Sequence, residues 1–596
     1  ATLRDQISAS YQQRIRSNFV LYLDQLLIKQ IQTDIHDNPS GLYSSLQTYL
    51  MLVTPDHRNP HTIKRWFANS WANTYQNDKS MQQQLMQHLN YLLALKNISW
   101  PTDQPLINQA QTLLKKQPLA KSVFTALASH YSGKSILLLS EPIDTVDGVP
   151  RAIPAMYSAE NFKKIYNQQI PHITNSIQQN NWIIGNTATH PIAQHPAEIT
   201  QHVQAMYLKN YIQAWQTTLT GIKLTPPKNV TQLRNEIQLL KNPNSPLWQL
   251  LNAVIKNAVA PNKVPDTNDS NNLGSLIAFL HKNNTYQATQ VALQDFNHYI
   301  KKIATAPSPT KSAYDAAAAR LQKNGNNDPL TTLLQVSKQL PTPINQWLAS
   351  LANHAWTIIL ANSHQYLATL WAANVAPEYN SHINNRFPIF KNSANDITIK
   401  DFNHFFGPGG TMQSFFNDQL KPFVNTDHVY WTWKSLDGQH LNIPQQTLDM
   451  IIRASMIQKM FYSDNPQAPT IQFNLTPIDL SSNISRFELN IGGQMLVFTP
   501  GIKKATHLSW PGSDGSFVTL RFATVADSPT ITLTGPWAWL HLVTQSIINS
   551  TNNPKEYQIT FTLKGNTARY QLRTDNPINP YQAQILWSFR APDSLY

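Results

Sequence analysis

Hydrophobic side chains before residue 400 recur at steps of three and four residues. The first run comprises Leu3, Ile7, Tyr11, Ile15, Phe19, Leu23, Leu26 and Leu27, and the same spacing returns in residues 85–95, 203–215, 247–255 and 347–370. This period keeps apolar side chains on one face of an α-helix. We therefore predict that most of the chain forms a multi-helix region.

The apolar pattern changes to a period of two after Asp464. Alternating positions are Ile471, Phe473 and Leu475, then Phe487, Leu489 and Ile491, then Met495 and Val497. Further strands are predicted at 517–522, 530–534, 557–563 and 568–572, with one helix at 537–548. Short strands separated by Asp, Gly and Pro turns are typical of an antiparallel β-sandwich. The predicted fold class is therefore mainly α with a C-terminal all-β domain.

Glycine usage supports the same division, because helices exclude glycine from their interiors. Seven of the 18 glycines lie before Phe406 and eleven follow it. Residues 402–433 predict a helix, a Gly407-Pro408-Gly409-Gly410 turn, a second helix and a Trp-x-Trp strand. We predict an N-terminal helical domain at 1–225, a second helical domain at 226–395, a helical connector with this turn at 396–466, and the β-sandwich at 467–596.

Three local signals refine the helical part. Ser245-Pro246 offers a capping hydroxyl followed by proline at the first helical position. Asn324-Gly325-Asn326 predicts a helix end, since glycine takes the left-handed conformation easily. Residues 262–272 are polar and contain proline, which predicts an exposed loop or linker.

The net charge and the distribution of basic residues limit the kinds of partner that the chain can bind. The net charge is +13, but the tightest basic clusters are pairs: Lys115-Lys116, Lys163-Lys164, Lys301-Lys302 and Lys503-Lys504. Nucleic-acid binding requires a concentrated basic face, so we predict no nucleic-acid partner, and attraction to an anionic membrane or wall polymer stays open.

The absence of cysteine excludes disulfides, thiolate zinc sites and cysteine nucleophiles. No segment approaches the ~18 apolar residues of a membrane helix, and no signal peptide follows Ala1. We expect either a cytoplasmic protein or part of a longer chain.

Candidate metal and nucleotide sites all depart from what their chemistry requires. Pro191 and Pro196 keep His190 and His195 off one regular helix, so His190, His195 and His202 are interpreted as solvated or structural. The calcium-like run 266–272 has Asn271 where an EF-hand needs glycine and Ile277 where it needs glutamate. The segment 130–135 ends like a P-loop, but Ala128 stands where the loop requires its first glycine. We predict no metal, no ATP and no other cofactor.

Catalytic candidates are equally weak. Glu141, Asp144 and Asp147 cluster before Gly148 and could orient a water, although carboxylates in loops are more often solvated. There is no Gly-x-Ser-x-Gly nucleophile elbow. We therefore predict that the chain is not an enzyme and assign no catalytic residue.

Tryptophans in the β-region are interpreted as half-buried core rather than a ligand groove; they are Trp431, Trp433, Trp510, Trp537 and Trp539. Loops on a rigid sheet can vary without unfolding it, so 511–516 and 549–555 are better candidates for partner contact. The sequence assigns no individual partner-binding residue.

Eight separated segments resemble the periplasmic part of the IcmF/TssM family, in the family's order. They are 46–71, 153–166, 205–215, 402–433, 487–494, 509–512, 535–542 and 579–592, and together they span nearly the whole chain. The sequence departs from the family pattern at Ser158, usually threonine, at Asn210, usually acidic, and at Ala591, often cysteine.

The resemblance implies a scaffold. Family members are large inner-membrane proteins of bacterial type VI and type IVB secretion machines, and their NTPase-like domain and membrane helices are not in this sequence. It implies the periplasmic region of such a protein, in a homo- and hetero-oligomer with a DotU/TssL-like inner-membrane protein and other secretion components. Type VI members also dock an outer-membrane lipoprotein through the sandwich.

The composition, rich in Asn, Gln, Lys and Ile, and a short periplasmic region favour the type IVB machine over type VI. Two other classes stay open. A cell-wall hydrolase would depend on Glu141 or Asp147, and a glycan-binding protein would use the tryptophans.

Overall fold

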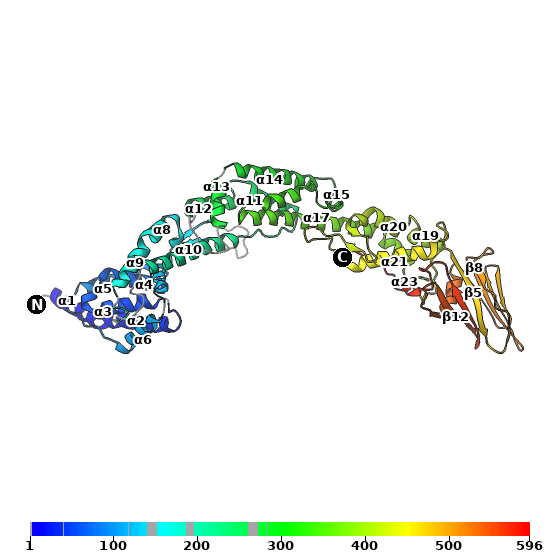
Figure 1. Cartoon of the computed structure of the whole chain (residues 1–596), viewed down its shortest axis with the longest axis horizontal. Coiled ribbons are helices and arrows are strands. Elements are labelled where there is room, and N and C mark those ends of the chain that lie inside the picture. Colours follow the sequence, from blue (N-terminus) through cyan, green and yellow to red (C-terminus); the bar gives the residue numbers. More distant parts are fainter. Residues whose placement is uncertain are drawn as a thin grey trace. The chain divides into compact units, whose positions relative to one another are not determined.

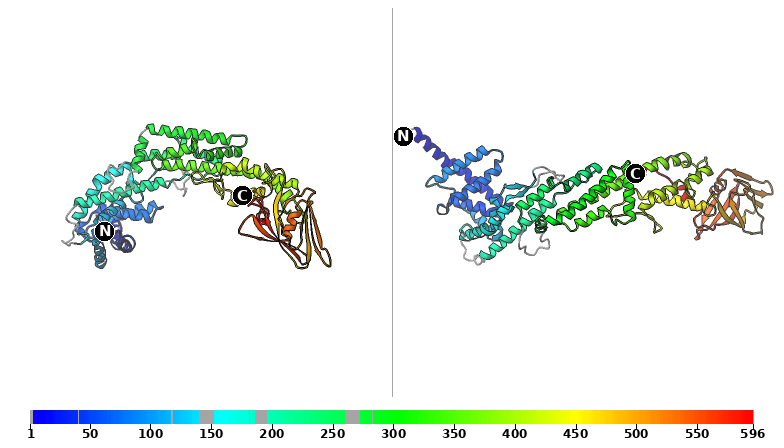
Figure 2. Two further views of the ribbon diagram at one scale, coloured as in Figure 1. Left: turned by 45° about the vertical axis from the view of Figure 1, so that its right-hand side comes forward. Right: turned by 90° about the horizontal axis from the view of Figure 1, so that it is seen from above.

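The computed structural model describes residues 3–39, 41–116, 118–139, 152–180, 182–185, 196–259, 272–281 and 283–595. The chain divides into two compact units. Unit 1 comprises Ala1–Pro227, Thr231–Asn297 and Leu333–Leu351, and unit 2 comprises Lys228–Val230, His298–Thr332 and Ala352–Tyr596. Figures 1 and 2 show helices throughout the blue, cyan and green parts, and the long strands gathered in the yellow-orange to red part.

Beside a two-stranded sheet of β1 (Ser135–Leu137) and β2 (Ala152–Pro154), unit 1 is built from helices. They are α1 (Leu3–Arg14), α2 (Val20–His36), α3 (Leu42–Val53), α4 (Pro60–Thr74), α5 (Lys79–Ala94), α6 (Gln104–Lys115), α7 (Leu119–His130), α8 (Ala159–Lys164), α9 (Ile170–Gln179), α10 (Pro196–Thr220), α11 (Val230–Lys241), α12 (Pro246–Asn257) and α13 (Asn272–His281). Helix α12 begins as the sequence predicts: Ser245 accepts a hydrogen bond from the Trp248 backbone N–H, with Pro246 at the first helical position. The predicted first amphipathic run is divided by a π-helical turn at Ile15–Phe19.

Two of the segments that carry the family resemblance, 153–166 and 205–215, meet inside unit 1. Tyr207 Oη donates to the Met156 carbonyl at 2.6 Å, and Trp215 Nε1 donates to the Tyr157 carbonyl at 3.0 Å. Both side chains are fully buried. Buried polar atoms need such partners, so these bonds fix α10 against residues 156–157.

Asp34 is an acidic side chain that is only 2% exposed in unit 1. It accepts hydrogen bonds from Ser45 Oγ (2.6 Å) and Gln30 Nε2 (2.8 Å), but burial raises its pKa above the ordinary 3.8. The pKa of Asp34 is therefore higher in the folded state than in the unfolded state. The protonated carboxyl contributes its full stability below the unfolded-state pKa, and this contribution is lost as pH rises through the folded-state pKa. We expect Asp34→Asn to gain stability relative to wild type from about pH 4 to pH 7, measured by urea unfolding. A difference that does not change with pH would contradict this.

Unit 2 begins with helices and a small hairpin. The helices are α15 (Pro309–Gln322), α18 (Ala376–Glu378), α19 (Ile399–Phe406), α20 (Thr411–Phe415) and α21 (Gln445–Tyr462), and the hairpin joins β3 (Val424–Asn425) to β4 (Thr432–Trp433). Three further helices, α14 (Asn283–Ala304), α16 (Pro329–Ser337) and α17 (Ile344–Asn374), contribute residues to both units. The predicted helix, glycine turn, second helix and Trp-x-Trp strand at 402–433 are confirmed, with a π-helical turn at Phe416–Leu420 before the hairpin.

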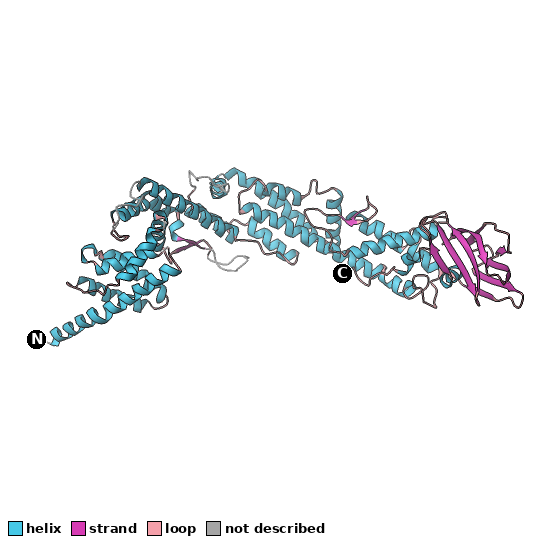
Figure 3. Cartoon of the chain, turned by 60° about the horizontal axis from the view of Figure 1, so that its bottom comes forward, coloured by secondary structure: helices cyan, strands magenta, loops and turns pink. Residues whose placement is uncertain are grey.

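Two antiparallel sheets complete unit 2, drawn in magenta in Figure 3. One has the order β10 (Thr530–Thr534), β9 (Phe517–Thr524), β6 (Ile484–Ile491), β7 (Gln494–Phe498). The other has the order β11 (Ile547–Ser550), β12 (Glu556–Leu563), β13 (Asn566–Arg573), β5 (Ile471–Leu480), β8 (Thr506–Trp510). Phe487 of the first sheet lies 5.8 Å from Phe561 of the second, between ring centres, so the inner faces pack together. The predicted fold class is confirmed.

The strand predictions need three corrections. Met495 and Val497 do not face the core, because they are 55% and 44% exposed, while Leu496 and Phe498 are buried. Residues 495–498 are all apolar, so the sequence pattern could not show which of them face the core. The helix predicted at 537–548 ends at Gln545 in α22 (Ala538–Gln545), and β11 follows it. Strands β8 and β11 were not predicted.

The predicted domain boundaries stay predictions. No helix within the described ranges is both long and apolar enough to cross a bilayer.

Candidate functional site

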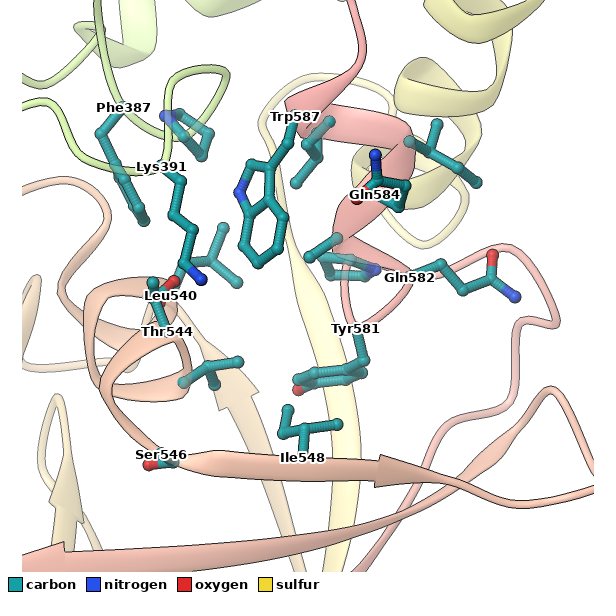
Figure 4. Close-up of a pocket in the computed structure, with 16 residues that line it drawn as sticks. Phe387, Lys391, Leu540, Thr544, Ser546, Ile548, Tyr581, Gln582, Gln584 and Trp587 are labelled. Carbon is teal, nitrogen blue, oxygen red and sulfur yellow. Dashed lines mark hydrogen bonds between the residues drawn. The ribbon is translucent and has the colours of Figure 1, made fainter.

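An apolar groove lies in unit 2 beside strand β11 (Figure 4). Its cavity measures about 410 Å³, within the ~300–1,000 Å³ usual for binding sites. It is formed by the loop 387–391, helix α22, strand β11 and the C-terminal segment 580–587, which includes α23 (Ala583–Trp587). Among the described residues that line it, Lys391 is the charged one. The groove therefore suits apolar side chains.

One wall of the groove is anchored in the sandwich core. Tyr581 Oη accepts a hydrogen bond from Trp539 Nε1 at 3.1 Å, and the Trp539 ring stacks on Phe473 with 4.6 Å between ring centres. Burial raises the pKa of Tyr581, so its hydroxyl stays neutral. The buried bond and the stack fix the wall in place before any partner arrives.

The opposite wall is held by a polar contact behind it. The Phe387 ring stacks on the His541 imidazole at 3.8 Å, and His541 Nε2 lies 2.8 Å from Asp396 Oδ1. Trp537 Nε1 donates to the Ile397 carbonyl at 2.7 Å. These contacts tie the loop 387–397 to helix α22, so the groove has two fixed walls.

The mouth of the groove combines a cation with a free sheet edge. Lys391 Nζ lies 4.6 Å from the centre of the Trp587 ring, and Figure 4 shows both side chains above Ile548 of β11. In the described sheet β11 pairs with β12 alone, and Ile547 is 59% exposed. An edge strand offers unpaired backbone groups to a further strand. An edge beside an apolar groove is the geometry that binds extended peptide segments.

Three family models match the chain. They are described as "IcmF-related: Intracellular multiplication and human macrophage-killing" over residues 1–258, "Type VI secretion protein IcmF helical domain" over 362–467, and "Type VI secretion protein IcmF C2-like domain" over 473–576. The chain belongs to the IcmF/TssM family. The resemblance seen in the sequence is thereby confirmed.

A curated relative within the IcmF/TssM family is "Type VI secretion system component TssM1" of Pseudomonas aeruginosa. It is 25% identical over 631 residues, which cover 96% of this chain and 57% of that protein. The chain thus spans little more than half the length of this relative. Its name describes a secretion-system component and not an enzyme.

Two solved structures share the fold. One is a "Type VI secretion system membrane core complex", with a TM-score of 0.59 and 16% identity. The other is a "Type VI membrane complex", with a TM-score of 0.58 and 15% identity. Each match covers 80% of this chain and 99% of the other. At these identities the likeness shows the fold alone.

Most of the candidates for chemistry fall on residues that the structure does not describe. His190, His195, Glu141, Asp144, Asp147 and 266–271 lie outside the described residues, and His202 is exposed on α10. In the ranges that are described, no group of three His, Asp or Glu side chains could hold a metal ion.

The P-loop-like segment has the wrong local order for a nucleotide site. Ala128 lies on helix α7, as predicted, and Gly133 and Lys134 connect that helix to strand β1 (Ser135–Leu137). A P-loop runs instead from a strand into a helix, whose first amides then face the phosphate. The segment here is therefore a helix-to-strand connection.

The tryptophan interpretation holds for the sandwich. Trp510, Trp537 and Trp539 are at most 2% exposed, and Trp431 and Trp433 are half-buried.

Of the two loops predicted for partner contact, 549–555 begins within β11 and therefore starts beside the groove. The loop 511–516 packs against the β6–β7 turn, where the Asp514 backbone N–H donates to the Gly492 carbonyl at 3.0 Å. Sequence reasoning missed Lys391, Tyr581 and Trp587. The family-like segment 579–592 could have indicated the last two, whereas Lys391 lies in a loop without a distinctive pattern.

Proposed function

We propose that this chain is the periplasmic region of a TssM-like scaffold protein in a type VI secretion machine, which it stabilises through protein–protein contacts. Support comes from the names of the curated relative, of the two structures and of two of the family models, all of which refer to type VI systems. The preference for a type IVB machine, based on composition and length, is not confirmed. The type VI alternative replaces it.

The observation that carries the scaffold function is the groove beside β11. Its walls are fixed by buried hydrogen bonds, its lining is mostly apolar, and the neighbouring strand has an open edge. Such a site binds an extended segment through backbone bonds to the strand and one or two apolar side chains in the cavity. We assign to it the docking of another secretion component. An outer-membrane lipoprotein and a DotU/TssL-like inner-membrane protein are the partners that the family suggests.

A photo-crosslinking amino acid at Ile547, in the intact protein in cells, tests this proposal. Ile547 lies on β11 and is 59% exposed, so the probe should not disturb the core. The matched control is Val525, a fully exposed aliphatic residue in the β9–β10 turn of the other sheet. We expect a specific crosslink from Ile547 to a type VI component, identified by mass spectrometry, and none from Val525.

Each other outcome removes part of the proposal. Crosslinks to type IVB core components would keep the scaffold but overturn the choice of machine. Equal crosslinking from both positions would overturn the groove as the docking site. Recovery of no secretion component would overturn the scaffold function itself.

A further inference from the structure

A second cavity lies in unit 1, among helices α2, α3, α4 and α7. It measures about 320 Å³, again within the ~300–1,000 Å³ of ligand sites. Its lining differs from that of the groove, because amides and hydroxyls predominate. The polar residues are Gln30, Asn38, Ser44, Gln47, Thr48, Thr62, Asn69, Ser70, Asn73, Thr74, Ser129 and Ser132, joined by Asp34, Arg65 and Trp66.

The floor of this polar pocket is a preorganised carboxyl group. Asp34 is held by the hydrogen bonds from Ser45 and Gln30 described above. Gly41 keeps the space beside it open, since a Cβ at that position would lie 3.0 Å from Asp34 Oδ1. Asn69 Nδ2 donates to the Ser129 carbonyl at 3.2 Å and so joins α4 to α7 across the pocket. The site is therefore shaped by fixed polar contacts.

Several polar groups of the pocket are left for a ligand. Among the described residues, none provides a hydrogen-bond partner for the side chains of Gln47, Asn73 or Arg65. Trp66 is half-buried, and its ring meets Phe67 edge-on with 5.0 Å between centres. One aromatic surface thus lies among amides that can both donate and accept.

This combination selects one class of ligand. Lipids require an apolar lining, and polyphosphates require more positive charge than Arg65 supplies. Sugar hydroxyls both donate and accept hydrogen bonds, as amides and hydroxyls do, and the apolar face of a sugar ring can cover an indole. A guanidinium recognises a carboxylate through two parallel hydrogen bonds.

We propose that the pocket binds a short glycan of N-acetylated hexosamines. Trp66 packs against a sugar ring, Gln47 and Asn73 hydrogen-bond its hydroxyl and acetamido groups, and Arg65 pairs with a carboxylate where the sugar carries one. This function is separate from docking at the groove and does not require it. In a periplasmic protein it would hold the scaffold to the cell wall.

Isothermal titration calorimetry of the 596-residue chain tests the proposal with two probes, tri-N-acetylchitotriose and a soluble muropeptide that carries a carboxylate. We expect saturable binding of both at one site. Trp66→Ala and Asn73→Ala should weaken both ligands at least tenfold. Arg65→Gln should weaken the muropeptide and leave chitotriose unchanged.

Gln83→Ala is the matched control, because Gln83 is exposed on α5 and does not line the pocket. Asn73 is exposed, so Asn73→Ala stays informative even if Trp66→Ala fails to fold. Binding of either ligand that survives Asn73→Ala, muropeptide binding that survives Arg65→Gln, or no heat of binding with millimolar sugar would overturn the pocket as a glycan site. A failure here would leave the Ile547 crosslinking result untouched, so the two proposals fail separately.

Discussion

Replacing Arg320 with alanine is expected to destabilise unit 2 by about 3 kcal/mol, the lower end of the range for breaking a buried ion pair. The Arg320 side chain is 1% exposed, whereas its partners Asp328 and Asp437 are 13% and 32% exposed. Solvent can therefore reach the carboxylates that the substitution leaves behind, which limits the loss. Differential scanning calorimetry of the whole chain, with hydrogen exchange at residues 436–439, measures the effect.

The size of this effect follows from the number of segments that Arg320 joins. From helix α15 its Nη2 donates to Asp437 Oδ2 at 2.6 Å, and its Nε lies 3.1 Å from Asp328 Oδ2, within ion-pair distance. The guanidinium carbon lies 4.6 Å from the centre of the Trp356 ring on α17, and Trp356 Nε1 donates to the Leu436 carbonyl at 3.0 Å. Two helices, the turn after α15 and the loop 436–439 thus share one cation.

Two further variants separate this ion-pair network from charge alone. Arg320→Lys keeps the charge but loses the planar fork, so it should recover only part of the stability. Lys311→Ala breaks an exposed pair with Asp315 one turn away and should change the stability far less than Arg320→Ala. Equal losses for Arg320→Ala and Lys311→Ala would show that burial of the network does not matter.

The fold class could be predicted from the sequence because local periodicity and core packing agree in most elements. The alternation at Phe487, Leu489 and Ile491 correctly predicted which side chains face the core. The intervening positions are polar or exposed, so only one register buries the apolar side chains. The same argument from alternation predicted the wrong face of β7, where Met495 and Leu496 are adjacent and both apolar. There the facing sheet decides, by placing Phe498 against Tyr570 at 5.9 Å between ring centres.

The groove could be predicted only in part, because it is assembled from segments far apart in the chain. Trp539 and Trp587 belong to family-like segments, yet no local pattern says that Lys391 lies over the Trp587 ring. The polar pocket of unit 1 was not predicted at all. Its amides and hydroxyls resemble those of any solvated helix face, and only the packing of α4 against α7 gathers them into one cavity.

The glycine turn at 407–410 was the clearest local signal, and the structure explains why glycine is needed there. The Gly407 backbone N–H donates to the Asn403 carbonyl at 2.9 Å and ends helix α19. A Cβ on Gly407 would lie 2.4 Å from that same oxygen, and one on Gly410 would lie 2.6 Å from the His404 carbonyl. Gly409 differs, because it has a φ of +72° but nothing within 4 Å of a Cβ. The close approach and the left-handed conformation can therefore be tested separately.

We expect Gly407→Ala to destabilise unit 2 by about 2–3 kcal/mol, because the clash is with backbone that cannot move without opening the end of α19. Gly409→Ala should cost only about 1 kcal/mol, the strain of a left-handed alanine in open space. Hydrogen exchange of the whole chain should show faster exchange at Phe405 and Phe406 in the first variant and wild-type rates in the second. If the two variants lose equal stability, backbone conformation alone requires these glycines, and the close contact with Asn403 contributes nothing.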